Sequence, residues 1–205
     1  MIENIIPGNK TRFNIIRVIY ENPDINLNSL IKKAKASPNL VLDYTSKLSK
    51  YGVINEKNIG EGKKKIHIKI LRPNFKTMIG KIMYSIVEID KRMLFFEKYP
   101  KLRSYFEQLN NLISDNADFA VIYGSYSRFS ATKESDIDIL IVGNFSNENI
   151  KRIRETFISL DIEPSFKIES FDSFLNNKNK PLYKNILEEH IILFGELKFI
   201  STFEE

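Results

Sequence analysis

The hydrophobic positions of residues 8–72 change from a helical period to an alternating one. Apolar residues first recur at the spacing of a helix, in the segments 10–22, 25–36 and 37–52. Ser37 and Pro38 are residue types that favour the start of the third helix, and Gly52 suits its end. A Gly- and Lys-rich stretch then leads into an alternating apolar segment that ends at residue 70. The pattern predicts three short helices followed by a β-hairpin.

The remaining residues predict a long helix and then a sheet. An apolar stripe at helical spacing covers residues 75–93, and Pro100 ends it before a second amphipathic segment. Residues 117–125 form a short apolar run that ends in a Gly-Ser pair, which is typical of a buried strand. Residues 135–143 form another strand, and its last half is apolar on both faces, which favours a central position.

Composition narrows the possible classes of protein. The chain has 205 residues, of which 42% are hydrophobic, and it has no cysteine. Disulfides, thiolate metal sites and cysteine nucleophiles are thereby excluded, and a reducing cytoplasm is the expected compartment. The first residues lack the long apolar run of a secretory signal, and no run reaches the roughly 18 to 20 residues that cross a bilayer. We therefore expect a cytoplasmic protein that is not bound to a membrane.

The net charge of +5 is unevenly distributed along the chain. Residues 1–72 carry 14 Lys and Arg against 6 Asp and Glu, whereas residues 73–205 carry 17 against 20. A basic first part and a mildly acidic second part suggest two modules with different partners. Basic excess alone is equally compatible with a solvated lysine-rich face.

The order of elements in residues 8–72 resembles that of winged helix-turn-helix domains. The resemblance implies that the third helix enters the major groove of duplex DNA and that the hairpin, or wing, contacts phosphates or the minor groove. The implied DNA-binding residues are Asn39, Asp43, Ser46, Lys47 and Lys50 on the helix, with Lys63, Lys64 and Lys65 on the wing. Lysines suit phosphates, and Asn and Ser can reach base edges. The alternative is a winged fold that serves protein contact or oligomerisation.

Two carboxylates, Asp136 and Asp138, alternate with isoleucines at the start of the strand at residues 135–143. Side chains alternate along a strand, so both acids share one face, with Cα atoms about 6.5 to 7 Å apart. Two such carboxylates repel each other and lose solvation unless a cation lies between them. Mg²⁺ prefers oxygen ligands and typically joins one or two carboxylates to substrate phosphates. The Gly124-Ser125 pair, ten residues before Asp136, can present backbone N–H groups and a hydroxyl to such phosphates.

Gly124-Ser125, ten residues and then Asp136-Ile137-Asp138 resemble the signature of the DNA polymerase β-like nucleotidyltransferases, most of all their small prokaryotic members. The resemblance, over roughly residues 102–195, implies in-line attack of an acceptor hydroxyl on the α-phosphate of a nucleoside triphosphate, with release of pyrophosphate. Asp136 and Asp138 would hold Mg²⁺ or Mn²⁺, and Gly124 and Ser125 would position the β- and γ-phosphates. Arg128 stands where small members often carry a basic residue; it is either a phosphate contact or a plain surface arginine.

This chain departs from the family pattern in two respects. Phe129 occupies a position where the pattern usually has glycine, and a bulky residue there could alter the loop or narrow the nucleotide pocket. Active members also carry a third acid on a later strand. Asp161 and Glu163 share a face of the candidate strand, and Glu163 is the preferred third metal ligand and catalytic carboxylate; the alternative is a surface glutamate. Pro164 indicates that this strand is broken or lies at an edge.

These observations predict an α+β protein with a winged helix-turn-helix domain at 1–72, a connector helix at 73–100 and a mixed-sheet nucleotidyltransferase domain at 101–205. One hypothesis is a metal-dependent enzyme that transfers a nucleotide to an unknown acceptor. Another is a DNA-binding regulator or antitoxin-like protein whose second domain only binds nucleotide. The long apolar stripe favours a homodimer, since two-fold winged proteins match two-fold DNA sites. By resemblance, a helical partner protein is a further possibility.

Overall fold

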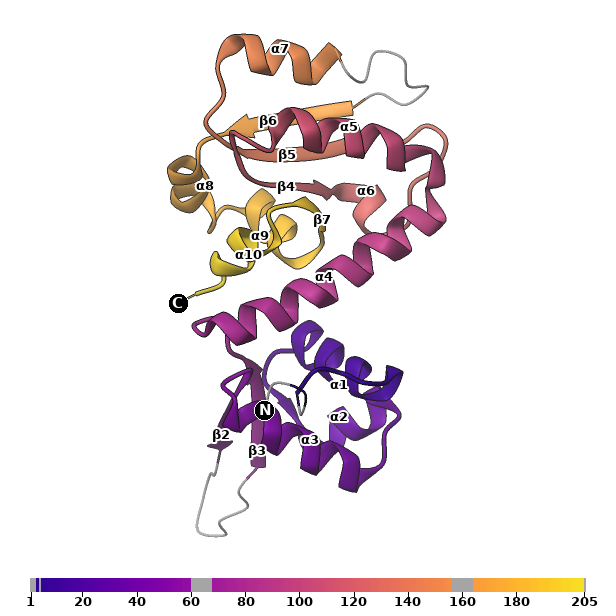
Figure 1. Cartoon of the computed structure of the whole chain (residues 1–205), viewed down its shortest axis with the longest axis vertical. Helices are drawn as coiled ribbons and strands as arrows, with labels where there is room; N and C mark the ends of the chain where they lie inside the picture. Colours follow the sequence, from indigo (N-terminus) through magenta and orange to yellow (C-terminus); the bar gives the residue numbers. More distant parts are fainter. Residues whose placement is uncertain (1–2, 4, 60–67, 156–163, 205) are drawn as a thin grey trace. The chain divides into compact units, whose positions relative to one another are not determined.

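The computed structural model describes residues 3, 5–59, 68–155 and 164–204. It divides into two compact units, one of Met1–Val87 with Phe203–Glu205 and the other of Glu88–Thr202 (Figure 1). The segment expected to connect two domains, residues 73–100, is divided between these units at Val87.

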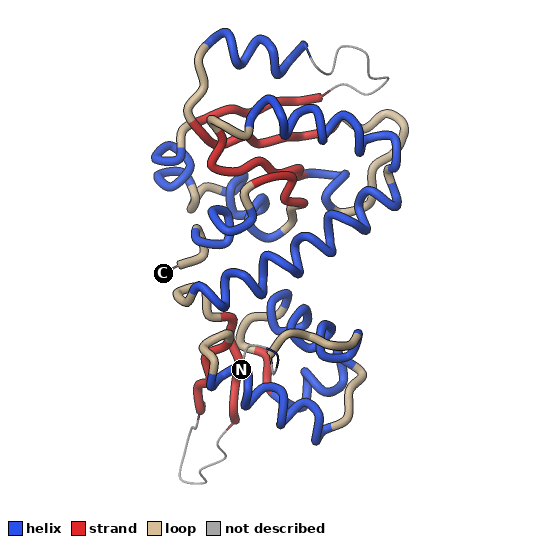
Figure 2. Tube along the Cα trace, in the orientation of Figure 1, coloured by secondary structure: helices blue, strands red, loops and turns tan. Residues whose placement is uncertain are grey.

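The first unit combines a helical layer with a small antiparallel sheet (Figure 2). Its helices are α1 (Lys10–Glu21), α2 (Leu27–Ala34), α3 (Pro38–Lys50) and the first part of α4 (Met78–Lys98). Its strands are β1 (Ile25–Asn26), β2 (Ile54–Ile59) and β3 (Ile68–Pro73), in the order β1-β3-β2. This is the arrangement of helices and hairpin that the hydrophobic pattern predicts.

Side-chain caps fix where the helices of the first unit begin. Asn9, Asn26 and Ser37 each accept a hydrogen bond from a backbone N–H of the first turn of α1, α2 and α3. Pro38, the first residue of α3, has no N–H to leave unpaired there. The predicted start of the third helix is therefore confirmed.

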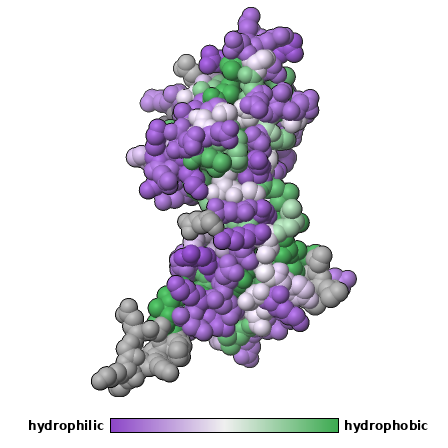
Figure 3. Space-filling model, turned by 90° about the vertical axis from the view of Figure 1, so that its left-hand side faces the viewer, coloured by the Kyte–Doolittle hydropathy of each residue, from purple (hydrophilic) through white to green (hydrophobic). Residues whose placement is uncertain are grey.

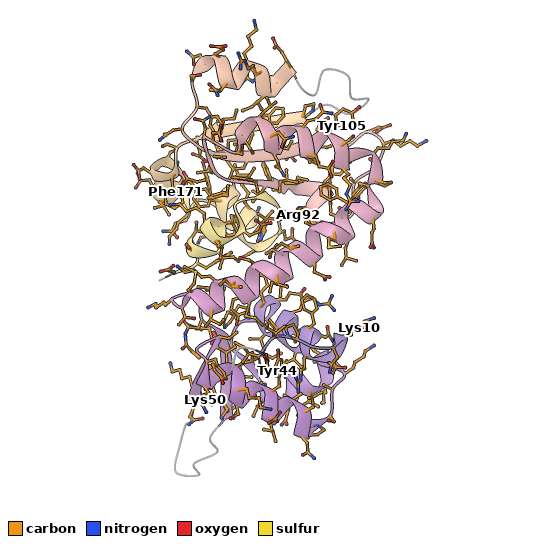
Figure 4. The ribbon with its side chains drawn as sticks, in the orientation of Figure 1. Lys10, Tyr44, Lys50, Arg92, Tyr105 and Phe171 are labelled. Atoms are coloured by element: carbon orange, nitrogen blue, oxygen red, sulfur yellow. The ribbon has the colours of Figure 1, made fainter. Side chains whose placement is uncertain are left out.

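Two tyrosines lie at the centre of the first unit. Tyr44 of α3 is fully buried, whereas Lys50 at the end of the same helix is exposed (Figure 4). Tyr84 of α4 stacks on Tyr20 at 5.2 Å between ring centroids, and its hydroxyl donates to the carbonyl of Val53 at 2.8 Å. The first turns of α4 thus belong to the core of this unit, and burial raises the pKa of Tyr84 far above its usual range.

The second unit is a four-stranded mixed sheet covered by helices. Its strands are β4 (Ala117–Tyr123), β5 (Ile137–Gly143), β6 (Pro164–Glu169) and β7 (Ile191–Phe194), in the order β6-β5-β4-β7. β4 is antiparallel to β5 and β7, and β5 is parallel to β6. The helical segments are the end of α4, η2 (Pro100–Leu102), α5 (Arg103–Ile113), α6 (Gly124–Ser127), α7 (Asn147–Glu155), α8 (Phe171–Asn177), α9 (Pro181–Glu188) and α10 (Glu196–Ser201).

The two faces of this sheet differ in their covering. One face, which we call the isoleucine face, carries Ile137, Ile139 and Ile141 of β5 and packs against α4, α5 and α7. The opposite face, the aspartate face, carries Asp138, Leu140 and Val142 of the same strand. There Phe119 of β4 contacts Phe174 of α8 and Phe199 of α10, each at 5.1 Å between ring centroids. These aromatic contacts lie toward the end of β5 that is remote from Asp138.

Polar contacts hold α4 against the strand β7 within the second unit. Arg92 donates to the carbonyls of Ile192 and Leu193 and pairs with Glu196 of α10 at 2.5 Å (Figure 4). One turn earlier, Glu88 is buried, with its carboxylate 3.3 Å from His190 Nε2.

The winged arrangement, the mixed sheet and the central position of β5 confirm the α+β fold that the sequence predicts. Within the described ranges, no helix is long and apolar enough to cross a membrane. Much of the visible surface is hydrophilic, with smaller hydrophobic areas between (Figure 3).

Candidate functional site

The turn from β4 into α6 lies directly against a carboxylate. Gly124 follows the last residue of β4 and has φ of +73°, in the left-handed region that glycine adopts most easily. A Cβ atom at this position would lie 2.4 Å from Oδ2 of Asp138, closer than any real Cβ contact. Any side chain at residue 124 would therefore displace either the turn or the carboxylate. Gly124 and Asp138, 14 positions apart in the sequence, are in direct contact in the fold.

Asp138 lies in an environment that disfavours its charge. It pairs in register with Tyr123 across the β4–β5 ladder, and its side chain is half-buried. Burial raises the pKa of Asp138, the nearby Asp136 raises it further, and the guanidinium of Arg128 lowers it. The structure therefore brings together Asp136, Asp138 and the Gly124 turn, as the sequence predicts.

The same negative charge acts on the neighbouring tyrosines. Burial and the Asp138 charge both raise the pKa of Tyr123, and burial, Tyr99 and Asp136 raise that of Tyr126. Both aspartates thus disfavour a further negative charge on the groups beside them. A divalent cation would remove this cost, and two adjacent carboxylates supply the oxygen ligands that Mg²⁺ or Mn²⁺ prefers. The residues present fit one such cation.

Arg128 connects the turn to the segment before β7. Its guanidinium lies 3.3 Å from the carboxylate of Glu189, and both side chains are about half exposed. Ser127 Oγ donates to the carbonyls of Gly124 and Glu189, at 2.9 and 3.1 Å. The loop that carries Gly124 is therefore attached to the chain ahead of β7. Glu189, which the sequence analysis did not identify, partly neutralises the cation nearest to Asp138.

Phe129 keeps the loop in the conformation that a glycine would favour. Its φ is +57°, so the residue is left-handed although it has a side chain. Its N–H donates to the Tyr126 carbonyl at 3.0 Å, and the ring packs edge-on to Phe95 of α4. The ring therefore contributes to the core of the isoleucine face, and this packing offsets the roughly 1 to 2 kcal/mol that a left-handed side-chain residue costs.

The third acid remains a prediction, because Glu163 and Asp161 lie outside the described residues. β6 begins at Pro164 and is an edge strand, as the proline predicts. In its register with β5, Ser165 lies opposite Asp138, and Lys167 and Glu169 follow on the same aspartate face. In the described part of the chain, no group of three or more His, Cys, Asp or Glu side chains could hold a metal ion.

Glu169 is the carboxylate of β6 on this face, and it is already bound. The hydroxyl of Tyr183 on α9 donates to its two oxygens at 2.8 and 3.0 Å, and Ser173 Oγ donates at 2.6 Å. Burial and this carboxylate raise the pKa of Tyr183 to about 12. The sequence did not identify either residue as part of the site. The alternation of polar side chains in residues 165–169 indicates the face on which Glu169 lies, but no sequence pattern indicates that Tyr183 contacts it.

The predicted DNA-binding residues of α3 lie on its outer side. Asn39, Asp43, Ser46 and Lys50 are exposed and Lys47 is half-buried, with its ammonium 2.7 Å from Asp43. The wing residues Lys63, Lys64 and Lys65 lie outside the described residues. One face of α3 is thus uncovered within the first unit. Lys50 lies on this face and, among the residues that the structure describes, forms no ion pair.

Comparison with known proteins identifies two matched segments. Residues 101–198 match the family described as polymerase beta nucleotidyltransferase, and residues 9–55 match a winged helix-turn-helix DNA-binding family. The chain is 32% identical over 75 residues to the protein named "Putative protein adenylyltransferase MJ0604" of Methanocaldococcus jannaschii. That match spans 36% of this chain and 75% of the relative.

Two solved structures are similar to part of the chain. One is a crystal structure of a toxin-antitoxin with AMP-PNP, with TM-score 0.34, 20% identity, and 47% of this chain and 82% of that one covered. The other is a "putative nucleotidyltransferase" from Sulfolobus solfataricus, with TM-score 0.30, 16% identity, and 51% and 84% covered.

Replacing Asp138 with Asn should stabilise the metal-free protein at neutral pH. The folded-state pKa of Asp138 lies above its unfolded value, so the native state is penalised at pH values above the folded pKa. The penalty disappears as the pH falls below the unfolded value, near 4. We expect Asp138→Asn to gain on the order of 1 kcal/mol at pH 7 and to converge with wild type at about pH 4.

Urea unfolding at a series of pH values, with a metal chelator present, measures this difference. The matched control is Asp115→Asn, which changes an exposed aspartate of the same unit. An Asp138→Asn protein that is less stable than wild type at pH 7 would contradict the account of the site.

Proposed function

Because the chain belongs to the polymerase β-like nucleotidyltransferases and carries a winged helix-turn-helix segment before that domain, we propose that it transfers a nucleotide to an acceptor and binds duplex DNA. The observation that carries the transferase proposal is the contact between the Gly124 turn and Asp138, with Asp136 beside it. This contact supports the proposal that the Gly124 turn binds phosphates next to a cation held by the two carboxylates.

Each residue of the site has a proposed task in the transfer. Asp136 and Asp138 would hold Mg²⁺ or Mn²⁺, which would neutralise charge on the phosphates. Gly124 and Ser125 bring backbone N–H groups to the β- and γ-phosphates, and Arg128 adds a positive charge at the mouth of the loop. The acceptor hydroxyl then attacks the α-phosphorus in line with the departing pyrophosphate, and the fixed turn holds that pyrophosphate in place. Glu163 is retained as the candidate third carboxylate.

The name of the relative in M. jannaschii supports a narrower proposal. That protein is named a "putative protein adenylyltransferase", which favours ATP as the nucleotide and a protein side chain as the acceptor. An alternative is a regulator that binds nucleotide without turnover. It is favoured by the described part of β6, which offers Lys167 and an already bound Glu169 on the aspartate face.

Pyrophosphate release separates the two functions. With Mg²⁺ or Mn²⁺, wild-type protein and each nucleoside triphosphate should release pyrophosphate in the presence of an acceptor. Asp136→Ala should lower the rate by at least roughly 100-fold, because it removes one of two metal-binding carboxylates. Asp115→Ala, at an exposed site of the same unit, should leave the rate unchanged. Release that persists in Asp136→Ala would overturn the assignment, and metal-dependent ATP binding without release would favour the regulator.

The first unit is proposed to bind duplex DNA through α3. Its affinity should fall steeply with added salt, because lysines release counterions from the phosphates, with a slope near −0.9 for each phosphate neutralised. Lys50→Ala should lower that slope by about one unit, whereas Lys184→Ala on α9 of the second unit should not. Fluorescence anisotropy with a labelled duplex, repeated from low to moderate salt, measures the affinity and its salt slope for wild type and for each variant. Binding that is absent or insensitive to salt would make this unit a protein-contact module.

A homodimer through α4 is proposed from its exposed apolar side chains. Met78, Ile82, Ile86, Ile89 and Met93 are each 38 to 64% exposed. From Ile82 onward their spacing of four, three and four residues is that of a helix that pairs with another helix. Ile82→Glu should shift a dimer to monomer in light scattering at micromolar concentration, and the control Leu112→Glu on α5 should not. A monomeric wild type would contradict the dimer and leave the stripe to a helical partner protein.

A further inference from the structure

Strand β6 places a lysine on the same face of the sheet as Asp138. Its side chains alternate, so Phe166 and Ile168 pack on the isoleucine face and Lys167 points to the aspartate face. Leu140 pairs with Lys167 in the parallel ladder, and Leu140 is two residues beyond Asp138 on β5. Neighbouring strands lie about 4.8 Å apart and rise about 3.3 Å per residue, so the Cα atoms of Lys167 and Asp138 are roughly 8 Å apart.

The ammonium of Lys167 rests on an aromatic ring. Its Nζ lies 5.6 Å from the centre of the Tyr183 ring, and the side chain is half-buried. The hydroxyl of that ring is bound to Glu169, which orients the ring from its far end. Among the described residues, no carboxylate lies within ion-pair distance of Lys167. A cation–π contact is a weak interaction that uses no N–H donor, so the ammonium can still donate hydrogen bonds to a ligand.

A triphosphate bound next to the aspartates needs a positively charged side chain such as that of Lys167. Two carboxylates balance one divalent cation, so the charge of a bound triphosphate must be met by side chains. Arg128 is partly neutralised by Glu189 at 3.3 Å. Lys167, by contrast, lies against the Tyr183 ring and forms no ion pair with any residue that the structure describes. It lies within the length of an extended side chain of the space beside Asp138, and three N–H donors make it a good phosphate ligand.

We propose that Lys167 binds the phosphate chain of the nucleotide held at Asp136 and Asp138. This inference rests on the proposed nucleotide site and adds to it a phosphate ligand on β6. The ammonium leaves the Tyr183 ring when the nucleotide binds, and it occupies the side of the site that Arg128 does not reach. Lys167 is then a binding residue that recognises a polyphosphate, irrespective of the base attached to it.

Calorimetry with ATP and Mg²⁺ tests the inference without requiring turnover. Lys167→Met keeps the aliphatic stem over Tyr183 and removes the charge, so it should weaken ATP binding by roughly 10- to 100-fold, the worth of a charged hydrogen bond. Lys167→Arg keeps the charge and should bind ATP within a few-fold of wild type. Lys184→Met, which removes an exposed lysine on α9, is the control for net charge and should bind as wild type does.

Each remaining outcome decides the question. Unchanged ATP affinity in Lys167→Met overturns the inference while the proposed function stands. If ATP binding is weakened equally in Lys167→Met and Lys167→Arg, while both melting temperatures stay at the wild-type value, the positive charge does not determine ATP affinity. This result also overturns the inference. A wild-type protein that does not bind ATP with Mg²⁺ removes the proposed function and the inference together.

Discussion

The site depends on one close approach, that of the Gly124 backbone to the carboxylate of Asp138. There is no room for a Cβ between them, so the turn and the carboxylate fix each other's position. The β4–β5 ladder maintains this approach, because Tyr123 and Asp138 are paired residues of adjacent strands. The Gly124 turn at the end of one strand and the carboxylate of Asp138 on the next are thus placed together by ordinary sheet register.

The negative charge of Asp138 lowers the stability of the folded, metal-free protein. Burial and a neighbouring carboxylate raise the pKa of Asp138, which means that its charge is costly in the metal-free protein. Phe129 adds backbone strain in the same loop. Both costs are offset away from the site, by the central position of β5 and by the packing of Phe129 against Phe95. Close packing on the isoleucine face thereby offsets the strain at Phe129 and the charge of Asp138.

Much of this architecture is predictable from local sequence, because it rests on periodicity and on residue types with one conformational preference. Ser37 and Pro38 indicate a helix start, and an apolar run such as residues 139–142 indicates a central strand. The partners of the site are harder to predict, because they meet through tertiary packing. Glu189 and Tyr183 reach it from segments more than 40 residues after Asp138, and nothing in their own surroundings marks them. Lys167 is visible only once the register of β6 against β5 is known.

The identity of the side chain at residue 129 illustrates how a departure from a family pattern can be tolerated. The pattern's glycine meets the need for a positive φ, and a phenylalanine must meet it at an energetic cost. The cost is acceptable because the half-buried ring packs beside Phe95 and because the ammonium of Lys98 donates to the carbonyl of Phe129. The loop therefore keeps its hydrogen bonds from Phe129 to Tyr126 and from Ser130 to Ser125. A bulky residue at this position leaves the Gly124 turn intact, since its ring packs against the core on the other face of the sheet.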